Sequence, residues 1–355
     1  MLMYVLTFIV KIYMKGGNND MAGRIEPEER TRQVLKVAYL FYEKGMTKTE
    51  ISHEIRSSTT QVIRLLEEAR EQGFVRIDFS PPKLQQLGEE LKKKYDWLHA
   101  VIAISYADDP VFLRRMLGKA AAQYFEVAVR EAAKVAIGGG DTMYEMVMAL
   151  PQEVRNVFLV PAAIIDSGPV LTHIDPTVLL TILWVRSGRR PGHAYFATGL
   201  PLNRPLSREK LKAEYEDFCR RGAIRVVLAE MKRVDFLFAS LGCLRADPDY
   251  LKLSPRPHKY LLDNLRLTEE RLAREGVVGD INYSFFDENG ETSAEWNIIP
   301  SLGVDRLREM VKAKKEVVVV VGKYKLPALK AALRGKLFNV LITDEIAARE
   351  LLNSV

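Results

Sequence analysis

The sequence predicts a two-domain protein in which a small helical domain precedes a larger α/β domain. Its 355 residues are too many for one ordinary domain. Two helix-capping patterns stand close together near the N-terminus, and beyond residue 100 apolar segments alternate with helical patterns. We predict residues 1–28 as a disordered leader, 29–80 as the helical domain, 81–96 as a linker helix and 97–355 as the α/β domain.

Composition excludes several classes of protein. The chain has 52 Lys and Arg against 46 Asp and Glu, an excess that permits an acidic partner such as DNA without requiring one. Its two cysteines, Cys219 and Cys243, are too few for a disulfide framework or a zinc site, and its histidines lack metal-ligand spacing. We therefore expect no metal ion and no cofactor.

The N-terminal segment, residues 1–10, is nearly all apolar. A run of about ten residues is half of the roughly twenty that cross a bilayer, and no A-x-A-like cleavage site follows it. We interpret residues 1–20 as an over-extended start or a disordered tail. We expect a cytoplasmic protein with no membrane partner.

The helical domain contains three short helical patterns. The second opens with Thr47–Glu50 and the third with Ser58–Gln61, and both openings are capping boxes. Two caps only eleven residues apart leave a second helix of about two turns, followed by a tight turn at Arg56–Ser57. A short helix, a tight turn and a longer helix make the helix-turn-helix arrangement.

The third helix has one apolar stripe, and the polar residues near its N-terminus lie on the opposite face. Gln and Arg side chains there suit adenine and guanine edges in the major groove. Phe74–Phe79 alternates as a wing strand does, which makes the domain winged-helix-like. The alternative is a helical hairpin with no nucleic-acid role. Our candidate DNA contacts are Lys48, Thr59, Thr60, Gln61 and Arg64.

The run from Met46 to Ile77 resembles the N-terminal domain of SorC-type sugar-responsive regulators, whose pattern is T-x-x-E-I-A followed by S-x-x-x-V-S-R-L-L-x-x-A-R-x-x-G-I-V. Two residues depart from that pattern: Arg56 stands where a turn glycine is usual, and Ile63 where a serine is usual. The resemblance implies a double-stranded DNA operator as partner.

The predicted linker helix carries Leu84, Leu87 and Leu91 on one seam and ends in Lys92–Lys94. Such a seam can pair with its copy in a second subunit. We interpret the lysine run as a solvated helix C-terminus, with contact to the DNA backbone as the alternative.

The α/β domain shows seven apolar segments typical of strands, and the continuous β-branched run Val317–Val321 is typical of a strand buried on both faces. Strands separated by helices predict a mostly parallel, Rossmann-like sheet, in which ligands bind at the carboxyl ends of the strands. The predicted strands are Ala100–Ser105, Lys134–Gly138, Val157–Val160, His193–Ala197, Val234–Ser240, Glu316–Gly322 and Val340–Thr343.

A glycine-rich loop, Gly138–Thr142, joins the second of these strands to a helix at Met143–Leu150. Glycines let a ligand approach the backbone, and a helix N-terminus attracts an anion. The alternative is that the glycines only form a tight turn, with Asp141 or Thr142 as an ordinary N-cap.

Three segments of the α/β domain resemble the SorC sugar-binding domain: Val135–Met143, the pair Gly276–Ile281 and Phe286–Gly290, and Val321–Gly335 with Leu341–Ala347. The resemblance implies a fold like the sugar-phosphate isomerases, used to sense a sugar or sugar phosphate without catalysis. It also implies a homo-oligomer, a dimer or tetramer. The ligand-binding positions it implies are Gly139, Gly140, Asp141, Thr142, His173, Asp175, Asp280 and Lys325.

Several of these positions depart from the family pattern. Asp141 stands where the family has residues friendly to phosphate, and Ala163 where several members have an anion-binding arginine. His173 and Asp175 replace the more common amides. Because carboxylates accept hydrogen bonds from hydroxyls but repel phosphate, a neutral or weakly anionic polyhydroxylated ligand suits the site at least as well as a bisphosphate.

The sequence favours a DNA-binding transcriptional regulator controlled by a carbohydrate or sugar-phosphate effector, and not an enzyme. It contains no nucleophile elbow, metal motif or dinucleotide fingerprint. One alternative is a sugar-phosphate isomerase-like enzyme with an N-terminal helical extension. The other is a regulator whose ligand site is degenerate.

Overall fold

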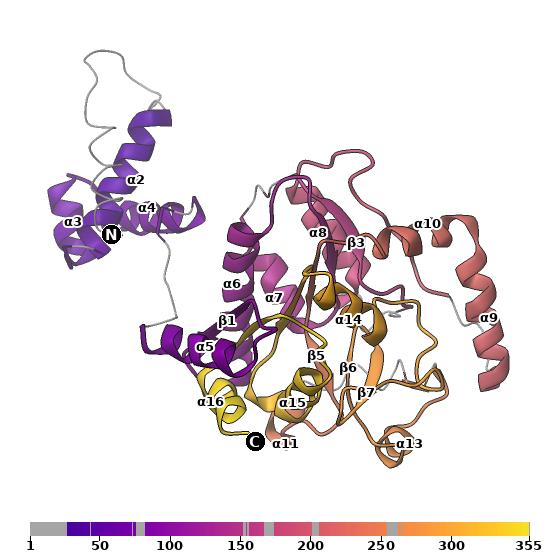
Figure 1. Ribbon diagram of the computed structural model, residues 1–355. Helices are drawn as coiled ribbons and strands as arrows, with labels where there is room; N and C mark the ends of the chain where they lie inside the picture. Colours follow the sequence, from indigo (N-terminus) through magenta and orange to yellow (C-terminus); the bar gives the residue numbers. More distant parts are fainter. Residues whose placement is uncertain are drawn as a thin grey trace. The chain divides into compact units, whose positions relative to one another are not determined.

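The computed structural model divides into two compact units, one up to Asp78 and one from Phe79 onward (Figure 1). The predicted leader lies outside the described residues except for its last two, which begin the first helix. The structure describes residues 27–42, 44–72, 74–75, 82–151, 154, 156–166, 174–200, 206–253, 262–263 and 265–354.

Within its described residues the first unit contains three helices, α2 (Pro27–Tyr42), α3 (Lys48–Glu54) and α4 (Thr59–Glu71). Thr47 completes the predicted capping box: its hydroxyl accepts from Glu50 N, and the Glu50 carboxylate accepts from Thr47 N at 2.7 Å. Ser58 Oγ likewise accepts from Gln61 N at 3.1 Å. The core of this helix-turn-helix is Val34, Val37, Ala38, Ile51, Val62, Leu65, Leu66 and Ala69.

The turn between α3 and α4 contains Arg56, at the position where the family pattern usually has a glycine. Arg56 has a φ of 51°, in the left-handed region that side chains other than glycine adopt at a cost. Val75 packs against the helical core, but neither it nor Phe74 is in a strand. The remainder of the predicted wing, residues 76–79, lies outside the described residues.

The second unit is built on a six-stranded parallel sheet in the order β1-β9-β8-β4-β2-β3. Val317 and Val319 pack on one side of the sheet, while Val318 and Val320 pack on the other. The predicted β-branched strand is therefore buried on both faces. The strands are β1 (Ala100–Ile104), β2 (Lys134–Ile137), β3 (Phe158–Pro161), β4 (Phe236–Ala239), β8 (Glu316–Val320) and β9 (Val340–Asp344).

Helices cover both faces of this sheet. One face is covered by α6 (Pro110–Ala128), α7 (Asp141–Ala149) and α8 (Pro176–Arg186). The helices whose apolar residues join the core on the other face are α5 (Pro82–Lys94), α9 (Arg208–Arg220), α10 (Gly222–Met231), α13 (Glu269–Arg274), α14 (Val304–Lys312), α15 (Leu326–Arg334) and α16 (Glu345–Asn353), with the short α11 (Pro248–Leu253) adding partly buried residues.

The predicted strand His193–Ala197 is wrong. Only Ala194 forms a bridge, to Leu159 of β3, with Leu159 N donating to His193 O and Tyr195 N donating to Leu159 O. The next residue of β3 whose backbone N–H would point to this side is Pro161, and proline has no N–H to donate. The pairing therefore stops after two hydrogen bonds.

A second, antiparallel sheet of three strands was not predicted: β5 (Leu241–Cys243), β6 (Val277–Ile281) and β7 (Ser284–Asp287). Its last two strands are joined by a two-residue turn at Asn282–Tyr283. Both turn residues have positive φ, as in a type I′ turn, although tyrosine rarely adopts that conformation.

The predicted linker helix, α5, packs against β1 and α16 of its own chain (Figure 1). Leu84, Leu87 and Leu91 are all buried in that contact and join the main core. These leucines are therefore used within their own chain and do not form a free seam that could pair with a second copy. Lys94 Nζ donates to carbonyls at the end of α16, including Leu352 O at 2.8 Å.

No helix within the described part of the chain is long and apolar enough to cross a membrane.

Candidate functional site

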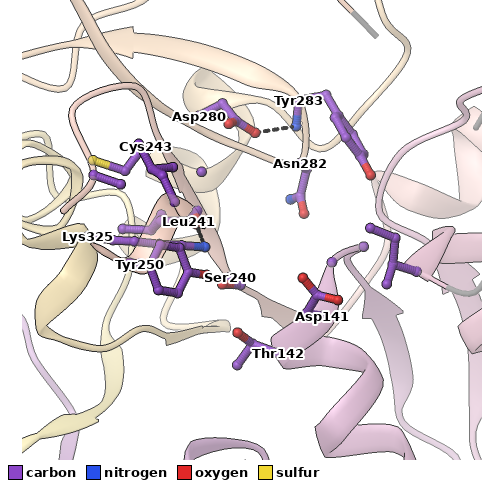
Figure 2. A pocket seen from close by; sticks show the side chains of 16 residues that line it. Asp141, Thr142, Ser240, Leu241, Cys243, Tyr250, Asp280, Asn282, Tyr283 and Lys325 are labelled. Carbon is purple, nitrogen blue, oxygen red and sulfur yellow. Dashed lines mark hydrogen bonds between the residues drawn. The ribbon is translucent and has the colours of Figure 1, made fainter. Parts of the chain in front are cut away.

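The sheet has a switch point beside β2. From β2 the chain moves outward to β3, then returns to the other side of β2 as β4. The segments that leave β2 and β4 therefore diverge, which opens a crevice at the carboxyl ends of the strands. A pocket that is partly open to solvent lies there (Figure 2).

Five segments far apart in the sequence form this pocket (Figure 2). They are the glycine loop with the start of α7, Ile174 before α8, the chain from the end of β4 to α11, the end of β6 with the β6–β7 turn, and the 3₁₀ helix η2 (Lys323–Lys325). The lining residues that carry polar side chains are Asp141, Thr142, Ser240, Cys243, Tyr250, Asp280, Asn282, Tyr283 and Lys325, and Gly139 and Gly140 lie beside them.

The glycine loop is pressed against the β6–β7 turn. A Cβ atom on Gly138 would lie 2.8 Å from Asn282 Oδ1, and one on Gly139 would lie 2.7 Å from the Tyr283 hydroxyl. Gly140 has a φ of 105° and precedes α7 without a side-chain cap. The first two glycines are thus required by loop packing and the third by backbone conformation.

Asp141 is the first residue of α7, and its side chain faces the pocket. Its Oδ2 lies 3.6 Å from Nη1 of Arg114, a residue of α6 whose side chain is 15% exposed. Arg114 also lines a smaller hollow that shares Thr142 and Lys325 with the main pocket. Sequence reasoning missed this arginine, because no motif surrounds it and only the packing of α6 on α7 brings it close.

Asp175, a predicted ligand residue, does not line the pocket. It is 7% exposed and caps α8, with its Oδ1 accepting from Thr177 N at 2.7 Å. Its neighbour Ile174 reaches the pocket instead. His173 lies outside the described residues.

Lys325 and Asp280 bring opposite charges to the pocket. Lys325 Nζ donates to Leu241 O at 2.6 Å and lies 5.6 Å from the centre of the Tyr250 ring. Asp280, on β6, is buried and accepts a hydrogen bond from Tyr283 N at 3.1 Å (Figure 2). Both residues were predicted to share one pocket, and both line it.

Two pocket side chains stay uncharged. Burial raises the pKa of the Tyr283 hydroxyl, and the carboxylates of Asp280 and Asp175 raise it further. Burial also raises the pKa of the Cys243 thiol, which makes it a poor nucleophile. Among the residues described, no group of three or more His, Cys, Asp or Glu is placed to hold a metal ion.

The candidate DNA contacts lie on the outer surface of the first unit. Lys48, Thr59, Thr60 and Arg64 are exposed, and Gln61 is half-buried. Lys48 begins α3, and the other four lie in the first two turns of α4. A recognition helix presents base-reading residues from its N-terminal part in this way.

The chain matches the family model described as "Putative sugar-binding domain" over residues 81–165 and 201–353, which is more than half of its length. The chain belongs to this family of SorC-type sugar-binding regulators. It is 25% identical over 330 residues to the deoxyribonucleoside regulator of Bacillus subtilis, a match that covers 92% of this chain and 99% of the relative. It is also 25% identical over 347 residues to the transcriptional regulator LsrR of Escherichia coli K12, covering 95% and 99%.

The fold of both units occurs together in a solved regulator. The full-length sorbitol operon regulator SorC of Klebsiella pneumoniae aligns with a TM-score of 0.61 and 22% identity, over 91% of this chain and 99% of that one. This likeness shows the fold of both units. The family match and the relatives named as regulators make this SorC-type protein a transcriptional regulator with a helix-turn-helix and a sugar-binding effector domain.

Proposed function

We propose that the pocket at the switch point binds a sugar-type effector, and that this binding controls attachment of the helix-turn-helix to an operator. The observation that carries the proposal is the convergence of Asp141, Thr142, Asp280 and Lys325 on one pocket at the strand ends. Carboxylates, a hydroxyl and an ammonium group around a small cavity suit a ligand rich in hydroxyl groups.

The charges around the pocket favour a ligand with at most one phosphate. Arg114 offsets Asp141, and Lys325 offsets Asp280. The N-terminus of α7 then remains as a site of partial positive charge. One phosphate suits that balance, whereas a second would face Asp280 in a buried setting.

The first unit would read the operator through Thr59, Thr60, Gln61 and Arg64 of α4, with Lys48 on the DNA backbone. We propose that the regulator acts in the cytoplasm. We also propose that it is a dimer or tetramer, because helix-turn-helix proteins bind two half-sites that lie a whole number of helical turns apart on the DNA. Light scattering with and without operator DNA measures this, and a monomer in both conditions contradicts it.

We propose that the effector domain binds without catalysis. Relatives named as regulators match this chain over nearly their full length, which supports a binding role over the alternative of an isomerase-like enzyme. Incubation of the protein with sugar phosphates, followed by NMR of the sugars, tests this. Conversion of one sugar phosphate into another contradicts the proposal.

A thermal-shift screen of the full chain tests the effector. The probes are ribose, deoxyribose, fructose and sorbitol, free and as monophosphates, with fructose 1,6-bisphosphate and thymidine. Sorbitol and a deoxyribonucleoside are included because the names of relatives mention them. A ligand present at 100 times its Kd stabilises the folded state by about 2.7 kcal/mol. If none of the probes raises the melting temperature, the proposal is contradicted.

Replacement of Asp141 separates the two ligand classes. Asp141→Arg adds a cation beside Arg114, so it should favour the bisphosphate over the free sugar if phosphate approaches the α7 N-terminus. Glu145→Arg, one turn further along α7 and paired with Arg115, is the matched charge change away from the pocket lining. If wild type already prefers the bisphosphate and Asp141→Arg gains nothing, our interpretation of Asp141 is wrong.

A further inference from the structure

Asn282 carries an unpartnered acceptor in the pocket. The residue is 5% exposed, its Nδ2 donates to Leu302 O at 3.2 Å, and its Oδ1 has no hydrogen-bond partner among the residues that the structure describes. The bond to Leu302 fixes the amide, because exchanging its two ends would place oxygen against a carbonyl. Figure 2 shows the amide pointing into the pocket.

Buried acceptors are nearly always paired, so this one calls for a donor. An amide oxygen can only accept a hydrogen bond. The partner is therefore an N–H or O–H group, and a phosphate dianion has none to offer. A ligand hydroxyl meets the requirement.

The backbone holds Asn282 in a fixed place. Asn282 and Tyr283 have φ values of 50° and 63°, and asparagine tolerates this conformation far better than tyrosine does. An Asn-Gly turn would avoid the strain at the second position. Instead the Tyr283 ring reaches across to the glycine loop, where its hydroxyl fills the space beside Gly139. Strain of this kind persists where surrounding contacts fix a residue for its function.

A second unpartnered atom belongs to another residue that lines the same pocket, Ser240. Ser240 follows β4, and its buried Oγ also lacks a hydrogen-bond partner among the described residues. Its hydroxyl can both donate and accept. Two residues that line one cavity, one in the β6–β7 turn and one directly after β4, thus each have an unsatisfied polar atom.

We propose that the β6–β7 turn is the hydroxyl-reading side of the effector site, where Asn282 Oδ1 accepts from one ligand hydroxyl and Ser240 contacts a second. This inference rests on the proposed function and adds a specificity rule to it. A sugar that lacks the hydroxyl facing Asn282 leaves a buried acceptor unpaired, so it binds weakly. Any phosphate lies at the opposite side, near the α7 N-terminus and Arg114.

Calorimetric titration of the full chain tests the rule, with the tightest-binding sugar of the screen as probe. Asn282→Gly keeps the turn, since glycine accepts positive φ, and removes the acceptor. It should weaken binding by about tenfold or more, and Ser240→Ala by roughly three- to tenfold. The control is Lys314→Gly, which replaces an exposed residue of φ 57° away from the pocket and should leave the Kd unchanged.

Single-deoxy analogues of that sugar identify the hydroxyl. One analogue should bind wild type more weakly than the parent sugar does, by about the factor by which Asn282→Gly weakens binding of the parent sugar. Asn282→Gly should bind this analogue no more weakly than it binds the parent sugar. A circular dichroism spectrum of Asn282→Gly equal to that of wild type, together with equal affinity of the two proteins for the analogue that lacks the contacted hydroxyl, excludes an effect of misfolding alone.

The outcomes separate the two levels of the argument. If no sugar of the screen binds wild type, the proposed function fails and this inference fails with it. If sugars bind wild type and Asn282→Gly binds them equally well, the inference alone is overturned. The inference is also overturned if each deoxy analogue loses the same factor of affinity, relative to the parent sugar, in Asn282→Gly as in wild type.

Discussion

The helix-turn-helix and the effector pocket are built over different distances along the chain. The caps, the turn and the eight buried apolar residues of the first unit all lie between Val34 and Ala69. The pocket instead joins side chains from Asp141 to Lys325, held by α7, β6 and η2. A substitution in the first region therefore acts on a local helical cluster, whereas one in the pocket acts on contacts between distant segments. The two activities should be separable by mutation.

The largest expected effect comes from the core of the first unit. Leu65→Ala removes a fully buried side chain and should destabilise this unit by about 2–5 kcal/mol. Because the unit is small, operator binding should be lost, while the melting shift caused by a bound sugar should persist. Circular dichroism melts and fluorescence anisotropy with operator DNA measure the two effects.

The matched control for Leu65→Ala is Ile63→Ala, two residues earlier on the same helix at a position that is 38% exposed. Its effect on stability should stay within about 0.5 kcal/mol. Loss of the sugar-induced shift in Leu65→Ala would show that the two units do not act separately.

Operator reading gives the next largest effect. Arg64→Ala should weaken operator binding by about 1–3 kcal/mol if the arginine contacts a base, without changing stability, because the side chain is exposed. Binding is measured by anisotropy over a range of salt concentrations. Arg32→Ala, an exposed arginine of α2, removes the same charge away from α4. Equal losses for the two variants would mean that Arg64 provides charge and not base recognition.

The two regions also differ in how far sequence patterns predict them. The caps at Thr47 and Ser58 are local hydrogen bonds between residues three apart, so their residue types alone predict them. Resemblance to a family predicted that the glycine loop, Asp280 and Lys325 bind a ligand; they line one pocket, and their role in binding stays a prediction. The wing at residues 76–79 stays a prediction.

Other parts of the pocket depend on packing that no local pattern records. Arg114 reaches Asp141 because α6 packs against α7. The turn at Asn282–Tyr283 lacks the usual Asn-Gly signal, so the second sheet was missed. Asp175 has the right residue type for a ligand but satisfies a helix N-terminus instead. The false strand at His193–Ala197 ends because of Pro161, which lies in a different segment.

A long-range ion pair in the effector domain gives a smaller, pH-dependent effect. The hydrogen bond from Lys134, at the start of β2, lowers the pKa of the Glu230 carboxyl on α10. A lowered folded-state pKa stabilises the fold above the ordinary carboxyl pKa of 4.5, and this stability is lost as the pH falls through the lowered value. Glu230→Gln should therefore be less stable at pH 7 by about 1 kcal/mol.

The melting temperature of Glu230→Gln measured from pH 7 to pH 3 checks this prediction. The difference from wild type should shrink as the pH falls below 4.5. Glu309→Gln is the control, since its pair with Arg306 joins neighbouring turns of α14 at an exposed position and should add little. A pH-independent difference for Glu230→Gln would mean that packing, and not the charge, is responsible.

The smallest effect tests the local character of the first unit through two residues with left-handed backbone. Arg56→Gly relieves the strain of φ 51° but makes the unfolded chain more flexible, so the net gain should be roughly 0.5 kcal/mol, or about 2–4 °C. Gly45→Ala is the mirror experiment: Gly45 has a φ of 66°, and nothing lies within 4 Å of an added Cβ. Backbone conformation alone should then destabilise this variant by about 1 kcal/mol. If the melting temperature falls in Arg56→Gly as it does in Gly45→Ala, contacts of the Arg56 side chain, and not its backbone conformation, decide the stability of the turn.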